Sequence, residues 1–537
     1  MKLKRQLSIW LSVLLAVSLL LAACAKDETE SANPEEREPG DNFNATGFPI
    51  VSEPVEIEVM GARHALVGEW KNLAFFREME KLTNVKFNYN TPPSSDYAEK
   101  KNLAFASGEI PEVFFGGQLT TDDEITYGQQ GILIPLEGLI EKYAPNIRKV
   151  LDENPEIKQS ITAPDGHIYA LPGVNQAPIA KLTSMWINGH WMQKLGITEA
   201  PRTTDEMYKM LKDFKEKDPN GNGEADEIPL TSIKLGDVRG MFLPAFGVLR
   251  REHMAVDDKV IYGALQPGYK AYLEYMNRLW KEQLLDPGTF SQTTEQKSAK
   301  GHAGQVGVFT DALPYLTLGG DSESSTIHPL VPAMTSPANP DQPIISQGSG
   351  ISRGTFAITN KCKYPEVIIR YVDYLWSPEG EILIHYGLEG DLWEWADDEK
   401  KLRKYIEHEG MNIEEYRGGK VTPAVGVSFP MFTPEEVENN WADPMHQFRI
   451  AEVDKKLKPY GKSPFPDIYL LPEERQQIQG IETDLNTYVE SMEAKFVTGE
   501  ASMDQWDTFV KTVKDMGIDK LLEVYQTGYD RWLAADK

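Results

Sequence analysis

The residues whose types and spacing best support chemistry lie between Asp218 and Glu227, where oxygen-bearing side chains occupy every second position from Asp218. Acidic or amide side chains stand at positions 1, 3, 5 and 9 of this stretch, and Gly223 stands at position 6. A calcium-binding EF-hand loop has the same spacing, because alternate residues of a curled loop point their oxygens at one hard cation. The spacing therefore predicts a Ca2+ site in this loop.

The loop departs from the EF-hand pattern at position 12, where Pro229 stands in place of the bidentate glutamate. Glu227, at position 10, is the natural substitute. We expect the carbonyl of Glu224 and five side chains to form the shell, namely Asp218, Asn220, Asn222, Asp226 and Glu227. The loop has no His or Cys and no evident open position, so the predicted ion is structural. The alternative is a solvated turn, which Asn-Gly dipeptides also favour.

The elements that must position this loop belong to an α/β fold. Residues 55–60, 85–89 and 113–115 have the composition of strands, and residues 73–82 and 96–106 between them have the pattern of helices. This alternation predicts a lobe with a largely parallel sheet. Just before the loop, Thr203 and Glu206 form a capping box that opens an amphipathic helix. The C-terminal part of the chain is predicted to be helical, with Gly517 ending one of its helices.

The first residues read as an export signal. Lys2, Lys4 and Arg5 precede an apolar run over residues 9–21, which is too short to span a bilayer comfortably. Leu21-Ala22-Ala23-Cys24 resembles the lipobox of bacterial lipoproteins. That resemblance implies cleavage before Cys24 and lipidation of its thiol with diacylglycerol carrying fatty acids such as palmitate. The alternative is an ordinary secretory leader with a chance cysteine.

Composition limits the partners of the chain. Its 537 residues carry a net charge of −27, and loss of the three leader cations gives −27 − 3 = −30 for the mature body. Such an acidic body would be repelled by nucleic acid and by anionic lipid. The only cysteines are Cys24 and Cys362, so lipidation of the first leaves no disulfide. Residues 24–50, acidic and polar, are predicted to form a disordered linker after the signal peptide of residues 1–23.

No catalytic motif in the sequence has the surroundings that its chemistry requires. Residues 350–354 match G-x-S-x-G, but an apparent strand follows the serine where a nucleophile elbow needs a helix. The nine histidines show no ligand spacing, and the acidic residues 397–399 read as a solvated face rather than a glycosidase pair. We therefore predict no catalytic residues and a protein that is not an enzyme.

A series of short segments resembles the extracellular solute-binding proteins (family 1) of ABC importers. The likeness is to the large oligosaccharide-binding branch with LipO-type lipoproteins and alginate-oligosaccharide-binding proteins. Each segment alone is weakly specific, but their order and spacing extend over nearly the whole mature chain. The segments are residues 107–113, 131–136, 143–146, 165–172, 186–188, 194–197, 356–359, 377–380 and 386–390, and the helices from 471 onward. The loop at 218–227 also resembles the calcium loop of that branch.

The resemblance implies an α/β, two-lobed periplasmic-binding-protein-like fold of type II, with a hinge, an interlobe cleft and a helical C-terminal part. Lobe 1 is expected to hold residues 51–165 and 305–375. Lobe 2 is expected to hold residues 166–304 and 376–537, including the calcium loop. Closure of such lobes on a ligand shifts the population toward the form that a transporter recognises.

Sugar recognition in such a cleft uses aromatic faces together with charged and amide groups. Trp393 and Trp395, with Glu389 and Asp391 beside them, are the first candidates, although packing of a lid is an equal alternative for the two rings. Four further candidates lie in loops, namely Arg63, Trp70, Tyr315 and Trp441. For each of these four, a structural role is the alternative.

The resulting hypothesis is a lipid-anchored, monomeric receptor on the outer face of the bacterial cytoplasmic membrane. It would capture an oligosaccharide and deliver it to the transmembrane permease subunits of an ABC transporter. A polysaccharide-active surface enzyme such as a lyase or glycosidase, a receptor for a peptide or another small solute, and a sensor subunit that feeds a kinase stay open as alternatives.

Overall fold

The computed structural model describes residues 40–535. The signal peptide, Cys24 and linker residues 25–39 lie outside the described residues. Residues 42–535 belong to one compact unit. Within its described part, apolar side chains gather in two large clusters and one small cluster, which we call the first core, the second core and the third cluster.

The first core surrounds a six-stranded sheet and draws on residues 50–174, 356–384 and 424–429 together with Tyr469. In spatial order the strands are β14 (Phe432–Thr433), β4 (Leu171–Asn175), β11 (Ile351–Ile358), β3 (Val113–Phe115), β1 (Val55–Met60) and β2 (Val85–Asn90). Strands β1, β2 and β3 run parallel, as predicted, whereas β11 pairs antiparallel with both β3 and β4.

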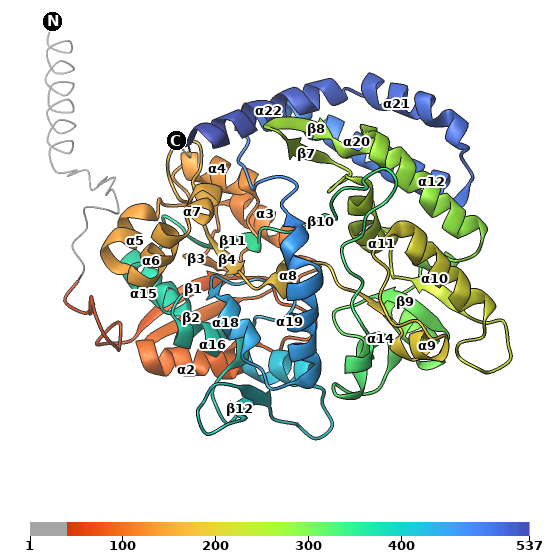
Figure 1. Cartoon of the computed structure of the whole chain (residues 1–537). Helices are drawn as coiled ribbons and strands as arrows, with labels where there is room; N and C mark the ends of the chain where they lie inside the picture. The colour runs from red at the N-terminus through yellow and green to blue at the C-terminus, as the bar shows by residue number, and fades with distance from the viewer. Residues whose placement is uncertain (1–39, 536–537) are drawn as a thin grey trace, which may run out of the picture. The chain divides into compact units, whose positions relative to one another are not determined.

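Eight helices accompany this sheet in the described chain (Figure 1). They are α2 (Ala74–Thr83), α3 (Tyr97–Ser107), α4 (Thr121–Gln129), α5 (Glu137–Tyr143), α6 (Pro145–Glu153), α7 (Pro155–Ile161), α15 (Pro365–Leu375) and α16 (Pro378–Tyr386). Helices α2 and α3 agree with the predicted ranges to within one residue. Residues 42–50 correct the prediction of a disordered linker up to residue 50, because they pack on this core. Ile50 is fully buried and Arg370 donates a 3.0 Å hydrogen bond to the carbonyl of Gly47.

The second core surrounds a three-stranded sheet and draws on residues 177–345 and 445–529. Its strands are β5 (Met185–Ile187), β9 (Val306–Thr310) and β6 (Ile228–Thr231), with β9 in the centre. Its helices include α8 (Pro178–Lys181), α9 (Gly189–Lys194), α10 (Thr204–Glu216), α11 (Leu235–Phe242), α12 (Pro267–Lys281), α13 (Thr294–His302), α14 (Tyr315–Leu318) and α19 (Pro444–Lys456). Two short antiparallel strands, β7 (His253–Val256) and β8 (Lys259–Tyr262), form a hairpin beside them.

The C-terminal helices are α20 (Pro472–Thr498), α21 (Trp506–Asp515) and α22 (Ile518–Ala535). They confirm the predicted helical end of the chain. Helix α20 packs on α12 and α22 packs on β8, so the end of the chain completes the second core (Figure 1).

The third cluster gathers apolar residues between Tyr386 and Trp441. Its elements are β12 (Trp393–Trp395), β13 (Arg403–Tyr405), α17 (Ile413–Tyr416), the π-helical turn η7 (Arg417–Val421) and α18 (Glu435–Asn439). Strands β12 and β13 form an antiparallel hairpin. A parallel pair of two-residue strands, β10 (Ile345–Ser346) and β15 (Gly461–Lys462), lies elsewhere, near the second core.

The cores divide the chain at other positions than the expected lobes. Residues 306–310 were expected in lobe 1, but β9 pairs with β5 and β6 in the second sheet. Trp376, Leu383 and Ile384 were expected in lobe 2, but they pack in the first core. Strand pairing joins segments far apart in sequence, which local patterns do not specify.

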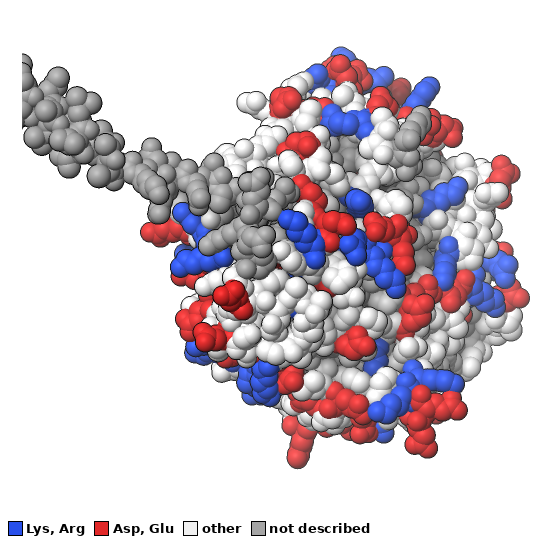
Figure 2. Space-filling model, turned by 90° about the vertical axis from the view of Figure 1, so that its left-hand side faces the viewer, with Lys and Arg blue, Asp and Glu red and all other residues white. Residues whose placement is uncertain are grey.

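On the face shown in Figure 2, Lys and Arg side chains stand among Asp and Glu side chains rather than in one basic patch. Among residues 40–535, no helix combines the length and the apolar content needed to cross a bilayer.

Candidate metal and ligand sites

The predicted metal loop connects α10 to β6 at the edge of the second core. The capping box at the start of α10 is present, with Thr203 accepting a hydrogen bond from the backbone N–H of Glu206. Within the loop, the carboxylate of Asp218 accepts bonds from the N–H groups of Gly221 at 2.8 Å and Gly223 at 3.2 Å. Both glycines have positive φ, so the glycine positions of the predicted turn are explained by its backbone.

Asp226 is the centre of the loop's polar contacts. Its carboxylate accepts bonds from the side-chain amides of Asn220 at 2.9 Å, Asn222 at 3.1 Å and Gln305 at 2.9 Å. These bonds, that of Gln305 first, lower the pKa of Asp226 below its usual range. Gln305 was missed by the sequence analysis because it immediately precedes β9, far from the loop along the chain.

Glu227 has the least satisfied carboxylate of the loop. Its Oε1 is buried and has no hydrogen-bond partner. Burial raises the pKa of Glu227, and the nearby carboxylates of Asp226 and Asp218 raise it further. A cation would relieve both effects, and all the predicted donors are oxygens, as Ca2+ requires. The side chain of Glu224 is exposed, in keeping with the prediction that only its carbonyl takes part. In the described chain, however, no three His, Cys, Asp or Glu side chains are gathered closely enough to hold a metal on their own.

Arg63 and Trp70 lie in the segment after β1, as predicted, but differ in exposure. Arg63 forms a 3.4 Å ion pair with Glu69, and 27% of its side chain is exposed. Trp70 is only 1% exposed and stacks on Phe76 at a centroid distance of 5.1 Å. Its ring packs so tightly that a Cβ on Gly61 would lie 2.4 Å from it. Trp70 is therefore a core residue in this conformation, with no ring face for a sugar.

Four predicted ligand residues lie together at the β12–β13 hairpin. Trp393 is buried and donates a 3.1 Å bond to the carbonyl of Gly387. Trp395 is half-buried and lies edge-on to Trp393, and its indole N–H donates a 3.2 Å bond to Glu389. Asp391 accepts a 2.6 Å bond from the hydroxyl of Tyr416. Glu389 is exposed and Asp391 and Trp395 are half-buried, so solvent reaches these three residues of the group.

Trp441 also belongs to the third cluster, and its environment reveals a residue that the sequence analysis missed. Its ring is 2% exposed and stacks on Tyr405 at 4.1 Å. The guanidinium of Arg403 lies 4.6 Å from the Trp441 ring and 4.9 Å from the Tyr386 ring. A buried arginine enclosed by aromatic rings is a cation–π core. Nothing in the local sequence marks Arg403, because the rings around it belong to three separate positions of the chain, Tyr386, Trp393 and Trp441.

Tyr315 begins α14 of the second core and is half-buried. Burial raises the pKa of Tyr315 to about 12, and the charges of Asp443 and Glu414 add to the rise against that of Arg449. The segment that holds Arg63 and Trp70 contacts the η7 turn, because the backbone N–H of Gly68 donates a 3.0 Å bond to the carbonyl of Gly418. Segments that hold predicted ligand residues of the first core and of the third cluster thus meet at residues 414–418.

The serine of the rejected G-x-S-x-G match and the cysteine of the described residues can both be placed in the structure. Ser352 lies within β11, which continues to Ile358, so no helix follows the serine. Burial raises the pKa of the Cys362 thiol to about 12, which keeps it protonated and unreactive at neutral pH.

Comparison with known proteins supports these assignments of fold. A family model described as bacterial extracellular solute-binding protein matches residues 63–382. The fructooligosaccharide ABC transporter substrate-binding protein FusA of Streptococcus pneumoniae serotype 4 is 30% identical over 550 aligned residues, covering 97% of this chain and 98% of FusA. Lipoprotein LipO of Bacillus subtilis is 22% identical over 427 residues, covering 71% of this chain and 83% of LipO.

Solved structures show the same similarity in their folds. FusA of S. pneumoniae in complex with kestose has a TM-score of 0.75 to this chain at 27% identity, covering 90% of this chain and 100% of that one. A FusA EF-hand mutant in complex with fructo-nystose has a TM-score of 0.74 at 27% identity and the same coverage of 90% and 100%. The predicted α/β, two-lobed fold class is confirmed by these likenesses.

Proposed function

This chain belongs to the family of bacterial extracellular solute-binding proteins, and from that premise we propose that it is the oligosaccharide-binding component of an ABC importer. The observation that carries the proposal is the similarity to FusA over almost the full length of both proteins. Full-length similarity includes both cores and the third cluster, and therefore every surface that could face a ligand between them. Fructo-oligosaccharides such as kestose are the first class of ligand to test.

Each proposed lobe is built around one of the two large apolar cores. The ligand would be held near the segment 414–418. Arg63, Tyr315 and Trp395 would contact the sugar directly, because each is partly exposed and comes from a different cluster. Glu389 and Asp391 would accept bonds from sugar hydroxyls. The buried rings of Trp70, Trp393 and Trp441 would support these residues from behind.

We further propose that Ca2+ binds in the loop at 218–227. Asp218, Asn220, Asn222, Asp226 and Glu227 would supply side-chain oxygens, and Glu224 its carbonyl. The observations in support are the unpartnered buried oxygen of Glu227 and the like charges around it. The ion would tie α10 to β6 and so contribute to stability, without touching the ligand.

The proposed location is the outer face of the cytoplasmic membrane, with the mature chain anchored through lipid on Cys24 and monomeric in solution. Delivery would be to the transmembrane permease subunits of the transporter. Replacing Cys24 with alanine should release the protein into the medium, measured by fractionation of cells. Retention of the Cys24→Ala protein in the membrane fraction would contradict the anchor.

Calorimetric titration of residues 25–537 with kestose, nystose and other oligosaccharides tests the function. We expect one class of sugar to bind and to be recovered uncleaved by chromatography. Consumption of the sugar would identify an enzyme instead, and absence of binding by every oligosaccharide would overturn the proposal. Trp395→Ala should weaken binding, whereas Trp532→Ala, on the outer helix α22, serves as the tryptophan control.

A further inference from the structure

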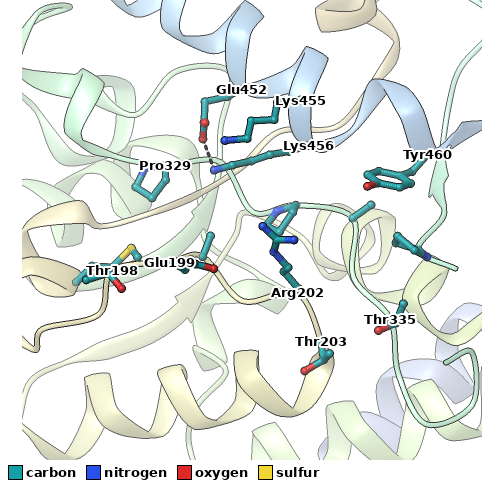
Figure 3. Close-up of a pocket in the computed structure, with 15 residues that line it drawn as sticks. Thr198, Glu199, Arg202, Thr203, Pro329, Thr335, Glu452, Lys455, Lys456 and Tyr460 are labelled. Carbon is teal, nitrogen blue, oxygen red and sulfur yellow. Dashed lines mark hydrogen bonds and ion pairs between the residues drawn. The ribbon is translucent and has the colours of Figure 1, made fainter. Parts of the chain in front are cut away.

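A cavity of about 680 Å3 opens on the second core, and none of the predicted ligand or metal residues lines it (Figure 3). Its walls come from the segment between α9 and α10, the segment 329–343, and the end of α19 with Tyr460. Apolar surface is provided by Met192, Ala200, Pro329, Pro332, Ala333 and Pro343. The volume is in the range of small-molecule sites.

Three cations face this cavity. Figure 3 shows Arg202 on one wall and Lys455 and Lys456 on the wall formed by α19. Lys456 forms an ion pair with Glu452 and donates a 2.9 Å bond to the carbonyl of Leu330. Burial lowers the pKa of Lys456, the bond and the charge of Glu452 oppose that change, and the charges of Lys455 and Arg202 add to it. Both of these cations therefore act on the charge of Lys456.

Two of these cations, Arg202 and Lys455, are exposed and form no ion pair within the described residues. The side chains of Arg202 and Lys455 form no hydrogen bond or ion pair with any other residue in the range 40–535. Lys458, one turn along, pairs with Glu435 at 2.9 Å and with Asp454 at 3.3 Å, so carboxylates are available to lysines in this region. Glu199 also lines the cavity but pairs with none of the cations there.

Exposed lysines without an ion pair also stand elsewhere in the described chain, Lys511 among them, so the distinguishing feature here is that three cations line one cavity. We propose that this cavity is a second binding site, for an anionic organic molecule of about monosaccharide size. Its carboxylate or phosphate group would pair with Arg202 and Lys455, since a guanidinium matches the geometry of an oxyanion. Its carbon skeleton would lie against the prolines and Tyr460.

This site is independent of the proposed oligosaccharide site. Its lining belongs to the second core and its surface, so the anion binds without movement of one core relative to the other. The affinity should fall as salt rises, because exposed charges are screened beyond about 8 Å at physiological ionic strength.

Calorimetric titration of residues 25–537 at low salt, with four probes, tests the proposal. Galacturonate and galactarate carry one and two carboxylates, glucose 6-phosphate carries a phosphate, and glucose is neutral. We expect at least one anion to bind and glucose not to bind, and the binding anion identifies the preferred group. Failure of all three anions to bind, or binding of glucose as tight as that of the anions, would overturn the proposal.

Substitutions locate the site. Arg202→Gln and Lys455→Gln should each weaken anion binding about tenfold, as expected for loss of one charged pair. Glu199→Gln should strengthen it by removing a like charge from the cavity. The control is Lys511→Gln, which removes an exposed charge from α21 and should have no effect. Equal affinity in all four variants would show that the anion binds elsewhere.

The oligosaccharide titration, repeated on the same variants, separates the two proposals. Kestose affinity should be unchanged by Arg202→Gln and Lys455→Gln. If anions bind as expected and no oligosaccharide binds, the function proposed above is contradicted and the proposal of an anion site in the cavity is supported. Arg202→Lys provides a second variant that keeps the charge but loses the bidentate geometry, should Arg202→Gln fold poorly.

Discussion

Glu124 on α4 is a carboxyl group buried where the first core meets the segment leading into α20. The hydroxyl of Tyr469 donates a bond to its Oε2, and the guanidinium of Arg353 lies 3.9 Å from the same oxygen. Arg353 also stacks 3.7 Å from the Tyr469 ring. The second oxygen of Glu124 is buried without a partner. Burial raises the pKa of Glu124 to about 7, against the attraction of Arg353 and the bond from Tyr469, and the charge of Asp123 adds to the rise.

A carboxyl group with a raised pKa binds more protons in the folded chain than in the unfolded chain. Its contribution to stability is therefore greatest below pH 4.5 and is lost as pH rises toward 7. The full effect is at most about 3 kcal/mol. Asp373, whose pKa burial raises to about 6, acts in the same direction, so the wild-type slope contains both groups.

Glu124→Gln isolates the first group, because glutamine does not titrate and can still accept the bond from Tyr469. We expect the free energy of unfolding of the wild type, minus that of the variant, to fall as pH rises from 5 to 8. Urea unfolding followed by circular dichroism at several pH values measures it. Parallel curves for the two proteins would contradict the assignment, and Glu99→Gln, at an exposed position on α3, is the control.

At the scale of elements, the attachment of α20 depends on one buried carboxylate. Glu493 is 1% exposed and accepts bonds from Arg239 of α11 at 2.7 Å, Arg251 at 2.8 Å and Tyr272 of α12 at 3.2 Å. Removing one partner of a buried charge network leaves the others uncompensated, at a cost of about 3–5 kcal/mol. The helix is thus joined to the rest of the second core by charge as well as by apolar contact.

We therefore expect Glu493→Gln to lower the free energy of unfolding by about 3 kcal/mol, measured in urea. Glu490→Gln is the matched control, since Glu490 lies three residues earlier on α20 and is exposed. A similar small loss in both variants would mean that apolar packing alone holds the helix.

The elements that the sequence predicted well are those whose causes are local. The alternation of residues in β1, the amphipathic face of α2 and the capping box at Thr203 depend on residues within a few positions of each other. The placement of β9 in the second sheet, the ring enclosure of Arg403 and the bond from Gln305 to Asp226 depend on segments far apart. Local sequence patterns do not predict such contacts.

The candidate site shows the same division. A metal site at residues 218–227 could be proposed from the sequence because its candidate donors lie within ten consecutive residues. The candidate ligand residues could not be separated into exposed and buried rings, because burial of Trp70 and Trp441 is decided by neighbours such as Phe76 and Tyr405. Tryptophans in loops look alike in sequence whether they face a ligand or a core.

At the scale of the whole molecule, stability comes from two large cores, and the metal loop touches only the second. Its flanking elements, α10 and β6, both pack there. Removing Ca2+ should therefore lower the thermal midpoint without abolishing the fold. A ligand at 100 times its dissociation constant stabilises by about 2.7 kcal/mol, and chelation would remove that contribution.

Scanning calorimetry of residues 25–537 in calcium and in excess chelator measures this difference. Glu227→Gln should reduce the difference between the two thermal midpoints, because it removes the charge of a carboxylate whose Oε1 is buried without a hydrogen-bond partner. Glu224→Gln should keep the full gap, because that exposed side chain is not an expected ligand. Identical midpoints with and without calcium would contradict the metal site. If both variants changed the midpoint difference equally, Glu227 would not be a ligand of the ion. Loss of a coordinating carboxylate must affect calcium binding more than loss of a solvated carboxylate three residues away.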